Sequence, residues 1–303
     1  MTPQLIGLDW GTSSFRAWLM AGDGSVVAEK AAPSGILTVA HGRFEDVFHA
    51  EIGGWLADHP GLPVIASGMI TSRNGWHETP YLPLPASARQ LADNLHPFTT
   101  QSGHTIQFVT GLARLDAGTT PDVMRGEETE LVGHIAASDL PGGLFVMPGT
   151  HSKWVTAANG EIRAFDTCMT GEAFALLRGQ SILGRLAEDG PFREEAFRAG
   201  VRAALENRKA LLSLVFSART LVLFKQLATD AVPDYLSGLL IGDEVKAGLA
   251  NHSAVDRPTI IGRGDLAERY RLAFEVFGRK ALMAEPGMAR RGLFEIGRLA
   301  KLS

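Results

Sequence analysis

An aspartate ends an apolar run near the start of the chain, and a turn of small residues follows it. The run is Leu5–Leu8, the acid is Asp9, and the turn consists of Gly11, Thr12, Ser13 and Ser14. Backbone N–H groups and hydroxyls in such a turn point into one concavity that holds a phosphate. Because phosphates repel a carboxylate unless a cation intervenes, the pattern predicts that Asp9 orients Mg²⁺, directly or through water. The simpler alternative is a β-hairpin whose first strand ends in a capping acid.

The same arrangement recurs in the middle of the chain. Leu144–Met147 is apolar, and the turn behind it consists of Gly149, Thr150, His151 and Ser152, followed by Lys153. Gly-Thr-x-Ser occurs in both turns, and a hairpin dipeptide follows each, Asp23-Gly24 and Asn159-Gly160. The second copy has Met147 at the position of Asp9, so the metal would fall to the first copy alone. The repetition predicts two related domains with one phosphate turn each.

A cluster of charges at 124–130, MRGEETE, opens an apolar helical pattern that runs to residue 137. Glutamates at the start of a helix suit its positive N-terminus. Here Glu127 or Glu128 would act as the base that takes a proton from a substrate hydroxyl. Arg125 would pair with an anionic substrate group or a phosphate. The alternative is the solvated charged face of an ordinary helix.

The segment 66–86, ASGMITSRNGWHETPYLPLPA, follows a predicted buried strand and is dense in polar and aromatic residues. Ligands of α/β proteins bind at the carboxyl ends of the strands. The side chains predicted to line a polar pocket there are those of Ser72, Arg73, Asn74 and Trp76. The alternative is a surface loop stiffened by its prolines.

A third glycine turn, GRGD at 262–265, lies between a predicted strand and a predicted helix. Gly262 and Gly264 would let the backbone approach an adenosine closely. The full GxGxxG pattern is absent, which argues against a dinucleotide site. An ordinary strand–helix turn is the alternative.

The elements that must position these residues form an α/β pattern. Strands are predicted at 63–70 and 105–112, and helices at 44–56, 126–137, 174–186, 194–214, 236–249 and 288–302. The segment 258–274 is predicted to be strand, turn and helix. Together with the two strand–turn–strand copies, this order is typical of an α/β protein.

Composition limits the classes of partner. The chain has 303 residues and a net charge of −4, so nothing indicates nucleic-acid binding, which calls for a basic surface. No apolar run approaches the roughly 18 residues that span a membrane, and we expect neither a membrane partner nor a signal peptide. The single cysteine, Cys168, suits a reducing cytoplasm.

Several strings resemble one known family. They are LDWGTSSFRAWL, GMITSRNGW, PYLPLPA, VMRGEETELVG, VMPGTHSKWV, MTGE and YLSGLLIGDEV, and they resemble the 2-dehydro-3-deoxygalactonokinase family from about residue 5 to about residue 300. DWGT and the repeated strand–turn–strand also resemble the actin, hexokinase and Hsp70 superfamily. This resemblance implies an α/β fold of two ribonuclease H-like, actin-like ATPase domains, each a mixed five-stranded sheet flanked by helices, with an ATP cleft between them. The expected domains are 1–135 and 136–303, with a last helix at 288–302 packing back on the first.

The resemblance further implies a cytoplasmic kinase that uses ATP and Mg²⁺ to phosphorylate the 6-hydroxyl of 2-dehydro-3-deoxy-D-galactonate in galactonate breakdown. The catalytic residues would be Glu127, Glu128 and Asp9, with Asp9 as the metal ligand. The ATP-binding residues would be Gly11, Thr12, Ser13, Ser14, Arg16, Gly149, Thr150, His151, Ser152, Lys153, Gly262 and Gly264. The substrate-binding residues would be Ser34, Gly35, Met69, Ser72, Arg73, Asn74, Trp76 and Arg125.

One departure and three alternatives stay open. Kinases of this superfamily often place a catalytic Asp where this chain has Gly126-Glu127-Glu128, and a glutamate can do the same work. For the acceptor carboxylate, Arg125, Arg73 and Arg16 are candidates in that order. The alternatives are a kinase for another keto-deoxy sugar acid or sugar, a nucleotide-dependent binding protein without catalysis, and a phosphate hydrolase. The oligomeric state is open, and a homodimer is one of its options.

Overall fold

The computed structural model describes residues 2–116, 118, 120–138, 141–208, 210–252 and 256–303. The strands are β1 (Pro3–Trp10), β2 (Phe15–Ala21), β3 (Val26–Ala32), β4 (Val64–Ser67), β5 (Tyr81–Pro83), β6 (Ala86–Ser87), β7 (His96–Thr99), β8 (Thr105–Phe108), β9 (Gly111–Arg114), β10 (Asp122–Met124), β11 (Gly143–Met147), β12 (Ser152–Ala158), β13 (Glu161–Cys168), β14 (Thr259–Ile260) and β15 (Leu282–Met283). The helices are α1 (Phe44–Asp58), α2 (Ala88–Asp93), α3 (Glu127–Ala137), α4 (Thr170–Gln180), α5 (Glu194–Glu206), α6 (Leu211–Leu214), α7 (Ser217–Leu223), α8 (Val232–Asn251), α9 (Gly264–Val276) and α10 (Met288–Leu299).

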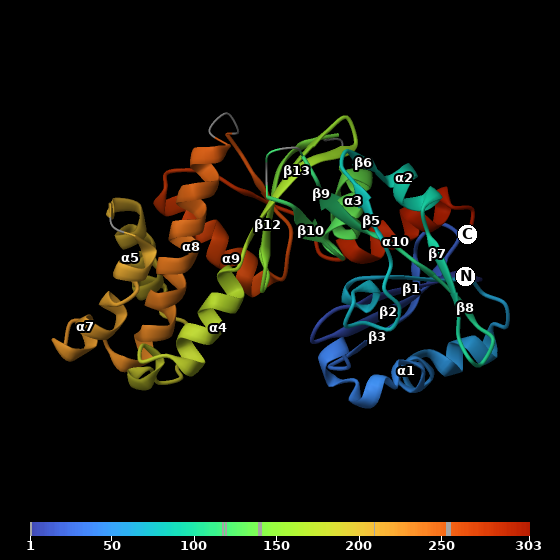
Figure 1. The fold of residues 1–303 in the computed structure, drawn as a ribbon, viewed down its shortest axis with the longest axis horizontal. Helices are drawn as coiled ribbons and strands as arrows, with labels where there is room; N and C mark the ends of the chain where they lie inside the picture. Colours follow the sequence, from blue (N-terminus) through green and yellow to red (C-terminus); the bar gives the residue numbers. More distant parts are fainter. Residues whose placement is uncertain (1, 117, 119, 139–140, 209, 253–255) are drawn as a thin grey trace. The chain divides into compact units, whose positions relative to one another are not determined.

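Two sheets share one strand order, as the repeated sequence pattern predicts. Figure 1 shows β1, β2 and β3 side by side in the first of them. The first sheet runs β3-β2-β1-β4-β8-β7, and the second runs β13-β12-β11-β14-β15 with β6 beside β13. In the first, β1 pairs antiparallel with β2 and parallel with β4. In the second, β11 pairs parallel with β14, and β14 pairs parallel with β15. Each turn of the Gly-Thr-x-Ser type therefore follows the central strand of its sheet.

Each sheet has one strand more than the five expected. The added strands are β7, antiparallel to β8, and the two-residue β6, antiparallel to β13. A small third sheet, β10-β9-β5, was not expected at all. It arises because the predicted strand 105–112 divides, with β8 ending at Phe108 and β9 starting at Gly111 in the other sheet. A Cβ on Gly111 would lie 2.5 Å from the Met124 carbonyl oxygen, which shows how closely β9 and β10 approach.

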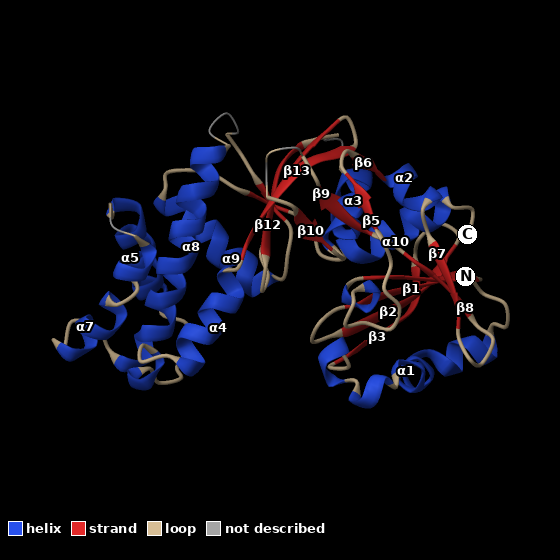
Figure 2. Cartoon of the chain, viewed as in Figure 1, coloured by secondary structure: helices blue, strands red, loops and turns tan. Residues whose placement is uncertain are grey.

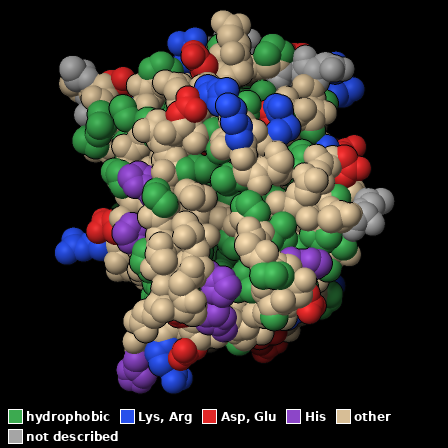
Figure 3. All heavy atoms as spheres, turned by 90° about the vertical axis from the view of Figure 1, so that its right-hand side faces the viewer, with side chains coloured by type: hydrophobic (Ala, Val, Ile, Leu, Met, Phe, Trp, Pro, Cys, Tyr) green, Lys and Arg blue, Asp and Glu red, His purple; other side chains and the backbone are tan. Residues whose placement is uncertain are grey.

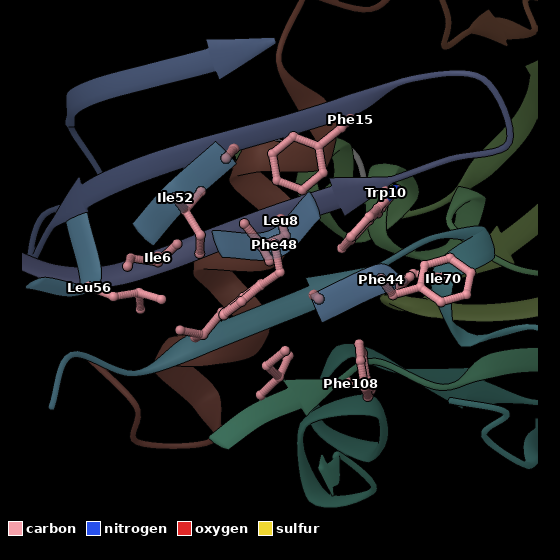
Figure 4. Close-up of a cluster of buried hydrophobic side chains, with 14 of the residues drawn as sticks. Ile6, Leu8, Trp10, Phe15, Phe44, Phe48, Ile52, Leu56, Ile70 and Phe108 are labelled. Carbon is pink, nitrogen blue, oxygen red and sulfur yellow. The ribbon is translucent and has the colours of Figure 1, made fainter. Parts of the chain in front are cut away.

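Large apolar side chains fill the space between the first sheet and α1 (Figure 4). Phe44, Phe48, Ile52 and Leu56 recur every four residues of α1 and form its buried stripe. They pack on Ile6, Leu8, Trp10, Phe15 and Phe108 of the strands. Because buried side chains of this kind are closely packed, they hold the central strand that carries Asp9 in a fixed position.

The chain divides into two compact units. Unit 1 comprises Met1–Gly142, Thr156–Phe165 and Glu285–Ser303, and unit 2 comprises Gly143–Val155 and Asp166–Ala284. Within unit 1, α10 packs against α3 and β1 at glycines. A Cβ on Gly292 would lie 1.8 Å from the Thr129 carbonyl oxygen, and one on Gly7 would lie 3.3 Å from Leu293 Cδ1. The expected domain limits, 1–135 and 136–303, stay a prediction.

Unit 2 adds a largely helical region to its strands (Figure 2). α5 and α8 cross where glycines bring their backbones together, since a Cβ on Gly200 would lie 2.2 Å from the Tyr235 carbonyl oxygen. Val146 of β11, Trp154 of β12 and Phe274 of α9 belong to one buried cluster with Ile241 of α8. The strand that leads into the second turn is thereby fixed to α8 and α9.

No helix among the described residues combines the length and apolarity needed to cross a membrane. On the face drawn in Figure 3, basic and acidic side chains are interspersed with polar and apolar ones. Neither sign of charge covers an extended area of that face.

Candidate active site

The ends of β1 and β4 and the start of α3 meet in unit 1. Asp9 and Ser67 are opposite each other in the parallel register. Gly68, at φ 99°, approaches so closely that a Cβ there would lie 2.8 Å from the Trp10 carbonyl oxygen and 3.3 Å from Asp9 Oδ1. A Cβ on Gly126, the residue before α3, would lie 3.3 Å from Gly68 Cα. These two glycines with positive φ allow the acid of β1 and the first turn of α3 to approach each other.

Asp9 is paired with an arginine. Arg16 is its antiparallel neighbour on β2, and Arg16 Nε donates to Asp9 Oδ2 at 2.8 Å. Arg16 Nη2 also contacts Asp9 Oδ2 and lies 3.5 Å from Glu130 Oε1 on α3. Burial, and next the Asp9 carboxylate, raise the pKa of Glu130 to about 7. Arg16 is therefore a cation beside Asp9 that the sequence argument did not place there, and Mg²⁺ binding by Asp9 stays a prediction.

The turn after Asp9 is supported from behind by residues 34–37. Ile36 N donates to the Gly11 carbonyl oxygen at 3.0 Å, and Leu37 N donates to that of Thr12 at 3.1 Å. A Cβ on Gly35 would lie 2.3 to 2.4 Å from three backbone atoms of Ser13. Ser34 accepts from Trp10 Nε1 through its carbonyl oxygen at 2.8 Å. Ser34 and Gly35 thus lie against the turn at 11–14, while Ser13 and Ser14 are exposed.

The two glutamates of α3 have different surroundings. Glu128 is 1% exposed, and its carboxylate accepts from Gly126 N at 2.7 Å and from Thr129 Oγ1 at 3.0 Å. Burial, and next the charge of Glu127, raise the pKa of Glu128 to about 8. Glu127 is only half-buried, and its Oε2 accepts from Arg125 N at 3.0 Å. Of the two, Glu127 is the one that solvent and a substrate can reach.

Arg125 is buried beneath the loop that follows β4. Its Nη1 donates to Thr71 Oγ1 at 2.9 Å and to Thr79 Oγ1 at 2.7 Å, and its Nη2 donates to the Thr79 carbonyl oxygen. The guanidinium carbon lies 4.0 Å from the centre of the Tyr81 ring. Arg125 therefore ties together both ends of the loop, a role that motif spacing does not reveal.

The other residues predicted to line the acceptor pocket differ in their exposure to solvent. The Trp76 ring packs in the core, 5.3 Å from the Phe98 ring, and Ser72 Oγ donates to the Met69 carbonyl oxygen at 2.7 Å. Arg73 and Asn74 are exposed at the tip of the loop. Among the described residues, no hydrogen-bonding or ionic partner of Arg73 is found. It is thus the candidate arginine whose charge is not already used.

In unit 2, the second turn is more deeply anchored than the first. Ser152 and Lys153 are 0% and 4% exposed. Ser152 Oγ donates to Glu244 Oε2 of α8 at 2.8 Å, and Lys153 Nζ donates to Thr167 Oγ1 at 2.8 Å. His151 is exposed and pairs with Glu172 of α4. The α4 backbone touches the turn, since a Cβ on Gly171 would lie 2.3 Å from the Gly149 carbonyl oxygen.

A cavity of about 230 Å³ opens next to this turn, within unit 2. Its wall includes Gly149 of the turn, Thr170 and Phe174 of α4, Asp234 of α8 and Arg269 of α9. Arg269 Nη1 lies 2.8 Å from Asp234 Oδ1 and its guanidinium covers the Phe192 ring at 4.2 Å. The predicted adenosine turn, Gly262 to Gly264, leads directly into α9, whose first turns supply part of this wall.

The candidate ligands for Mg²⁺ in unit 1 are side-chain oxygen atoms at the ends of β1 and β4. Asp9 Oδ2 is bound by Arg16, and the Ser67 hydroxyl opposite is buried without a hydrogen-bond partner among the described residues. No group of three or more acidic, histidine or cysteine side chains in the described chain is arranged to hold a metal. Mg²⁺ in phosphoryl transfer is commonly held by one or two carboxylates plus the substrate's own phosphates. Asp9 with Ser67 fits that pattern.

Sequence reasoning missed several residues of these sites, among them Ser67, Glu130, Thr170 and Glu244. Glu130 was visible in the MRGEETE cluster but was not assigned a role, although its spacing places it one turn from Gly126. Thr170 and Glu244 lie in the strings MTGE and YLSGLLIGDEV, which carried the resemblance but no chemistry of their own. Their role appears only when the second turn and α8 are seen together.

Comparison with known proteins places these features in a family. The family model of 2-keto-3-deoxy-galactonokinase matches residues 9–296. A Rhizobium meliloti (strain 1021) protein named as a probable 2-dehydro-3-deoxygalactonokinase is 37% identical, with 89% of each chain covered. The 2-dehydro-3-deoxygalactonokinase of Escherichia coli (strain K12) is 35% identical and covers 92% of this chain and 91% of its own.

Solved structures agree with this. A Sinorhizobium meliloti structure assigned to the same activity has a TM-score of 0.88 and 36% identity, covering 97% of this chain and 98% of that one. The Clostridium difficile activator of 2-hydroxyisocaproyl-CoA dehydratase, solved with ADPNP, has a TM-score of 0.52 at 11% identity, covering 99% and 95%. The latter likeness concerns the fold alone, which is that of the actin-like ATPases. The chain belongs to the 2-keto-3-deoxy-galactonokinase family.

Proposed function

We propose that this protein is a sugar-acid kinase that transfers the γ-phosphoryl group of ATP to the 6-hydroxyl of 2-dehydro-3-deoxy-D-galactonate in galactonate catabolism. The observation that carries the proposal is the family match over residues 9–296, joined to an acid and a phosphate turn at the end of β1. Phosphoryl transfer requires mainly positioning and charge neutralisation. The residues described above supply both.

For the acceptor, we assign the general base to Glu127. Its carboxylate is half-buried at the start of α3, whereas that of Glu128 is enclosed. In the reaction the 6-hydroxyl oxygen bonds to the γ-phosphorus as the bond to the ADP oxygen breaks, and Glu127 takes the hydroxyl proton. Arg16 and Arg125 have protein partners, so we assign the acceptor carboxylate to Arg73, with Asn74 beside it.

For the nucleotide, we assign phosphates to the two turns, at 11–14 and at 149–153. The base and ribose would enter the cavity of unit 2, reached from Gly149 and from the Gly262–Gly264 turn. A space of about 230 Å³ suits the nucleoside part and not a whole nucleotide, since pockets for larger ligands run from roughly 300 Å³ upward. Asp9, with Ser67, would hold Mg²⁺, which when bound offsets the charge of the phosphate oxygens.

We place the enzyme in the cytoplasm, because its one cysteine, Cys168, forms no disulfide. A homodimer is the oligomeric state we propose to test first. Size-exclusion chromatography with light scattering would give the mass directly.

The test is ADP release by the purified protein with MgATP and each of several acceptors: the galactonate compound, its gluconate epimer and simple hexoses. Release with the galactonate compound alone is expected. Release with a different acceptor would overturn the substrate, and release without any acceptor would indicate a phosphate hydrolase. ADP binding without acceptor-dependent release would indicate a nucleotide-dependent binding protein.

Two variants test the assigned roles. Glu127→Gln keeps an acceptor for Arg125 N but loses the base, so kcat should fall about 100-fold or more. Arg73→Ala should raise KM for the sugar acid about 10-fold or more and leave KM for ATP unchanged. Arg43→Ala, an exposed arginine of unit 1 with only Asp46 3.5 Å away, is the matched control. An Arg73→Ala enzyme with an unchanged KM for the sugar acid would contradict the assignment.

A further inference from the structure

A buried glutamate of α8 lies under the second turn. Glu244 is 5% exposed, and its carboxylate accepts hydrogen bonds from four neutral side chains. Oε1 accepts from Trp154 Nε1 at 2.8 Å. Oε2 accepts from Ser152 Oγ at 2.8 Å, from Tyr270 OH at 2.6 Å and from Thr170 Oγ1. One carboxylate thus joins the turn, β12, α4 and α9 to α8.

The donors of this cluster are held in place. A Cβ on Gly248, one turn along α8 from Glu244, would lie 2.4 Å from Trp154 Cη2, so the indole lies against the helix backbone. Its N–H can only donate. Burial, and next the Glu244 charge, raise the pKa of the Tyr270 hydroxyl well above its usual value, so it stays a donor. The carboxylate therefore cannot turn to other partners.

This arrangement fixes the direction of two hydroxyl groups. A hydroxyl has one hydrogen, and a carboxylate can only accept. With its hydrogen donated to Glu244, Thr170 presents only lone pairs elsewhere. Ser152 directs its hydrogen mainly to Glu244 at 2.8 Å, with the Cys168 carbonyl oxygen at 3.3 Å as a second acceptor. Thr170 lines the cavity beside Gly149, so its free side faces whatever enters there.

We infer that Glu244 is a positioning residue for nucleotide binding: it anchors the second turn through Ser152 and makes Thr170 Oγ1 an obligate hydrogen-bond acceptor in the cavity wall. The ligand group that meets Thr170 must then be a donor, such as a ribose hydroxyl or an amino group. The inference rests on the proposed function, because it assumes that a nucleotide enters this cavity.

The decisive variant is Glu244→Gln. Trp154 can only donate, so the amide oxygen must face it, and the amide NH₂ must face the three hydroxyls. The NH₂ group has two hydrogens and does not accept, so none of the three hydroxyls can donate to it, and the Thr170 hydrogen turns toward the cavity, where it opposes a donor. We expect the Kd for ADP, measured by titration calorimetry without acceptor, to rise about 10-fold. KM for ATP should rise to a similar extent, and KM for the sugar acid should stay within about 2-fold of wild type.

Two further comparisons separate positioning from a general loss of structure. Asp243→Asn makes the same chemical change one residue away on α8, at a partly buried carboxylate outside the cluster, and should leave ADP affinity within about 2-fold. Thr170→Val, which removes the hydroxyl, should weaken ADP more than Thr170→Ser. Glu244→Gln combined with Thr170→Val should be no weaker than the weaker single variant, because both act through one hydroxyl.

The outcomes are distinct. Wild-type protein that binds no ADP would overturn the proposed function and this inference with it. Wild-type protein that binds ADP, beside a folded Glu244→Gln with the same affinity, would overturn the inference alone, as would equal losses in both KM values. If Glu244→Gln does not fold, equal ADP affinities of Thr170→Val and Thr170→Ser would overturn it.

Discussion

The two Gly-Thr-x-Ser turns follow the central strands of sheets with the same strand order. The carboxylate near each turn, however, comes from a different element. In the first, the acid is Asp9 on the central strand itself, paired with Arg16 on the next strand. In the second, Met147 and Trp154 occupy the corresponding positions, and Trp154 donates to Glu244 of α8. The serines differ as well, because Ser14 is exposed and Ser152 is buried.

The two turns have the same place in the backbone fold but different side chains around them. The strand order places a turn of backbone N–H groups at the same point of each sheet. The acid of the first turn is partly exposed and has a cation beside it, which suits a group that exchanges partners during a reaction. The acid of the second is enclosed by four neutral donors, which suits a fixed support. We therefore expect the first turn to take part in the reaction and the second turn to bind the nucleotide without taking part in it.

The largest expected effect comes from exchanging the acid of the first turn. Asp9→Asn removes the charge that would meet Mg²⁺ and leaves Glu130 as the one carboxylate beside Arg16 in the described part of the chain. We expect kcat with the sugar acid to fall about 100-fold or more, measured as ADP release at saturating substrates.

Met147→Leu is the matched change in the second copy. Met147 is buried, and a swap of similar volume in a core usually costs under about 1.5 kcal/mol. Its kcat should stay within about 2-fold of wild type. Equal losses of kcat in Asp9→Asn and Met147→Leu would contradict the distinction between the two turns.

An intermediate effect is expected at Gly35, which packs against the first turn. In Gly35→Ala the new methyl group would lie 2.3 to 2.4 Å from Ser13 backbone atoms, so the turn must shift. The free energy of unfolding should fall by about 1–3 kcal/mol, measured by urea denaturation. Gly264→Ala at the start of α9 meets nothing within 4 Å and should keep or slightly raise stability. A Gly35→Ala protein as stable as wild type would show that the turn is not supported from behind.

The smallest expected effect concerns how stability varies with pH, and it comes from the buried Glu128. The pKa of Glu128 is raised from 4.5 to about 8 in the folded chain. Between these values the folded protein keeps a proton that the unfolded chain releases, so the free energy of unfolding falls as pH rises. Glu128→Gln cannot titrate, so wild type should lose Tm relative to this variant by a few degrees from pH 5 to pH 8.

Thermal unfolding at several pH values measures this difference, and it should level off above about pH 8. Glu29→Gln, an exposed glutamate on β3, serves as the control and should follow wild type throughout. A constant difference between wild type and Glu128→Gln over the whole range would contradict the assignment of a shifted group at this position.

Much of the backbone around both turns follows from local sequence. Apolar runs, Gly-Thr-x-Ser and the hairpin dipeptides predict β1 to β3 and β11 to β13, and the same reasoning predicts α3. Such signals depend on residues close together in the chain, so they can be recognised in a single sequence. The prediction of one strand at 105–112 is wrong because the division between β8 and β9 depends on which sheet each half joins.

The chemistry of the sites depends on longer distances. Ser152 and Glu244 are 92 residues apart, and Arg16 and Glu130 are 114 apart, so no local pattern joins them. Asp9 and Arg16 are only 7 apart, and the hairpin register could have paired them. Arg125 was ranked first of the three arginines for the acceptor carboxylate, whereas in the structure it donates to Thr71 and Thr79.

The packing of α10 in unit 1 has a consequence for how the protein is made. Gly292 of α10 touches the backbone of α3 at Thr129, and Leu293 lies against β1 at Gly7. β1 is therefore covered by a helix that is made long after it. A nascent chain that does not yet contain residues 285–303 leaves that face of β1 open to solvent, so unit 1 completes its folding only after these residues have been made.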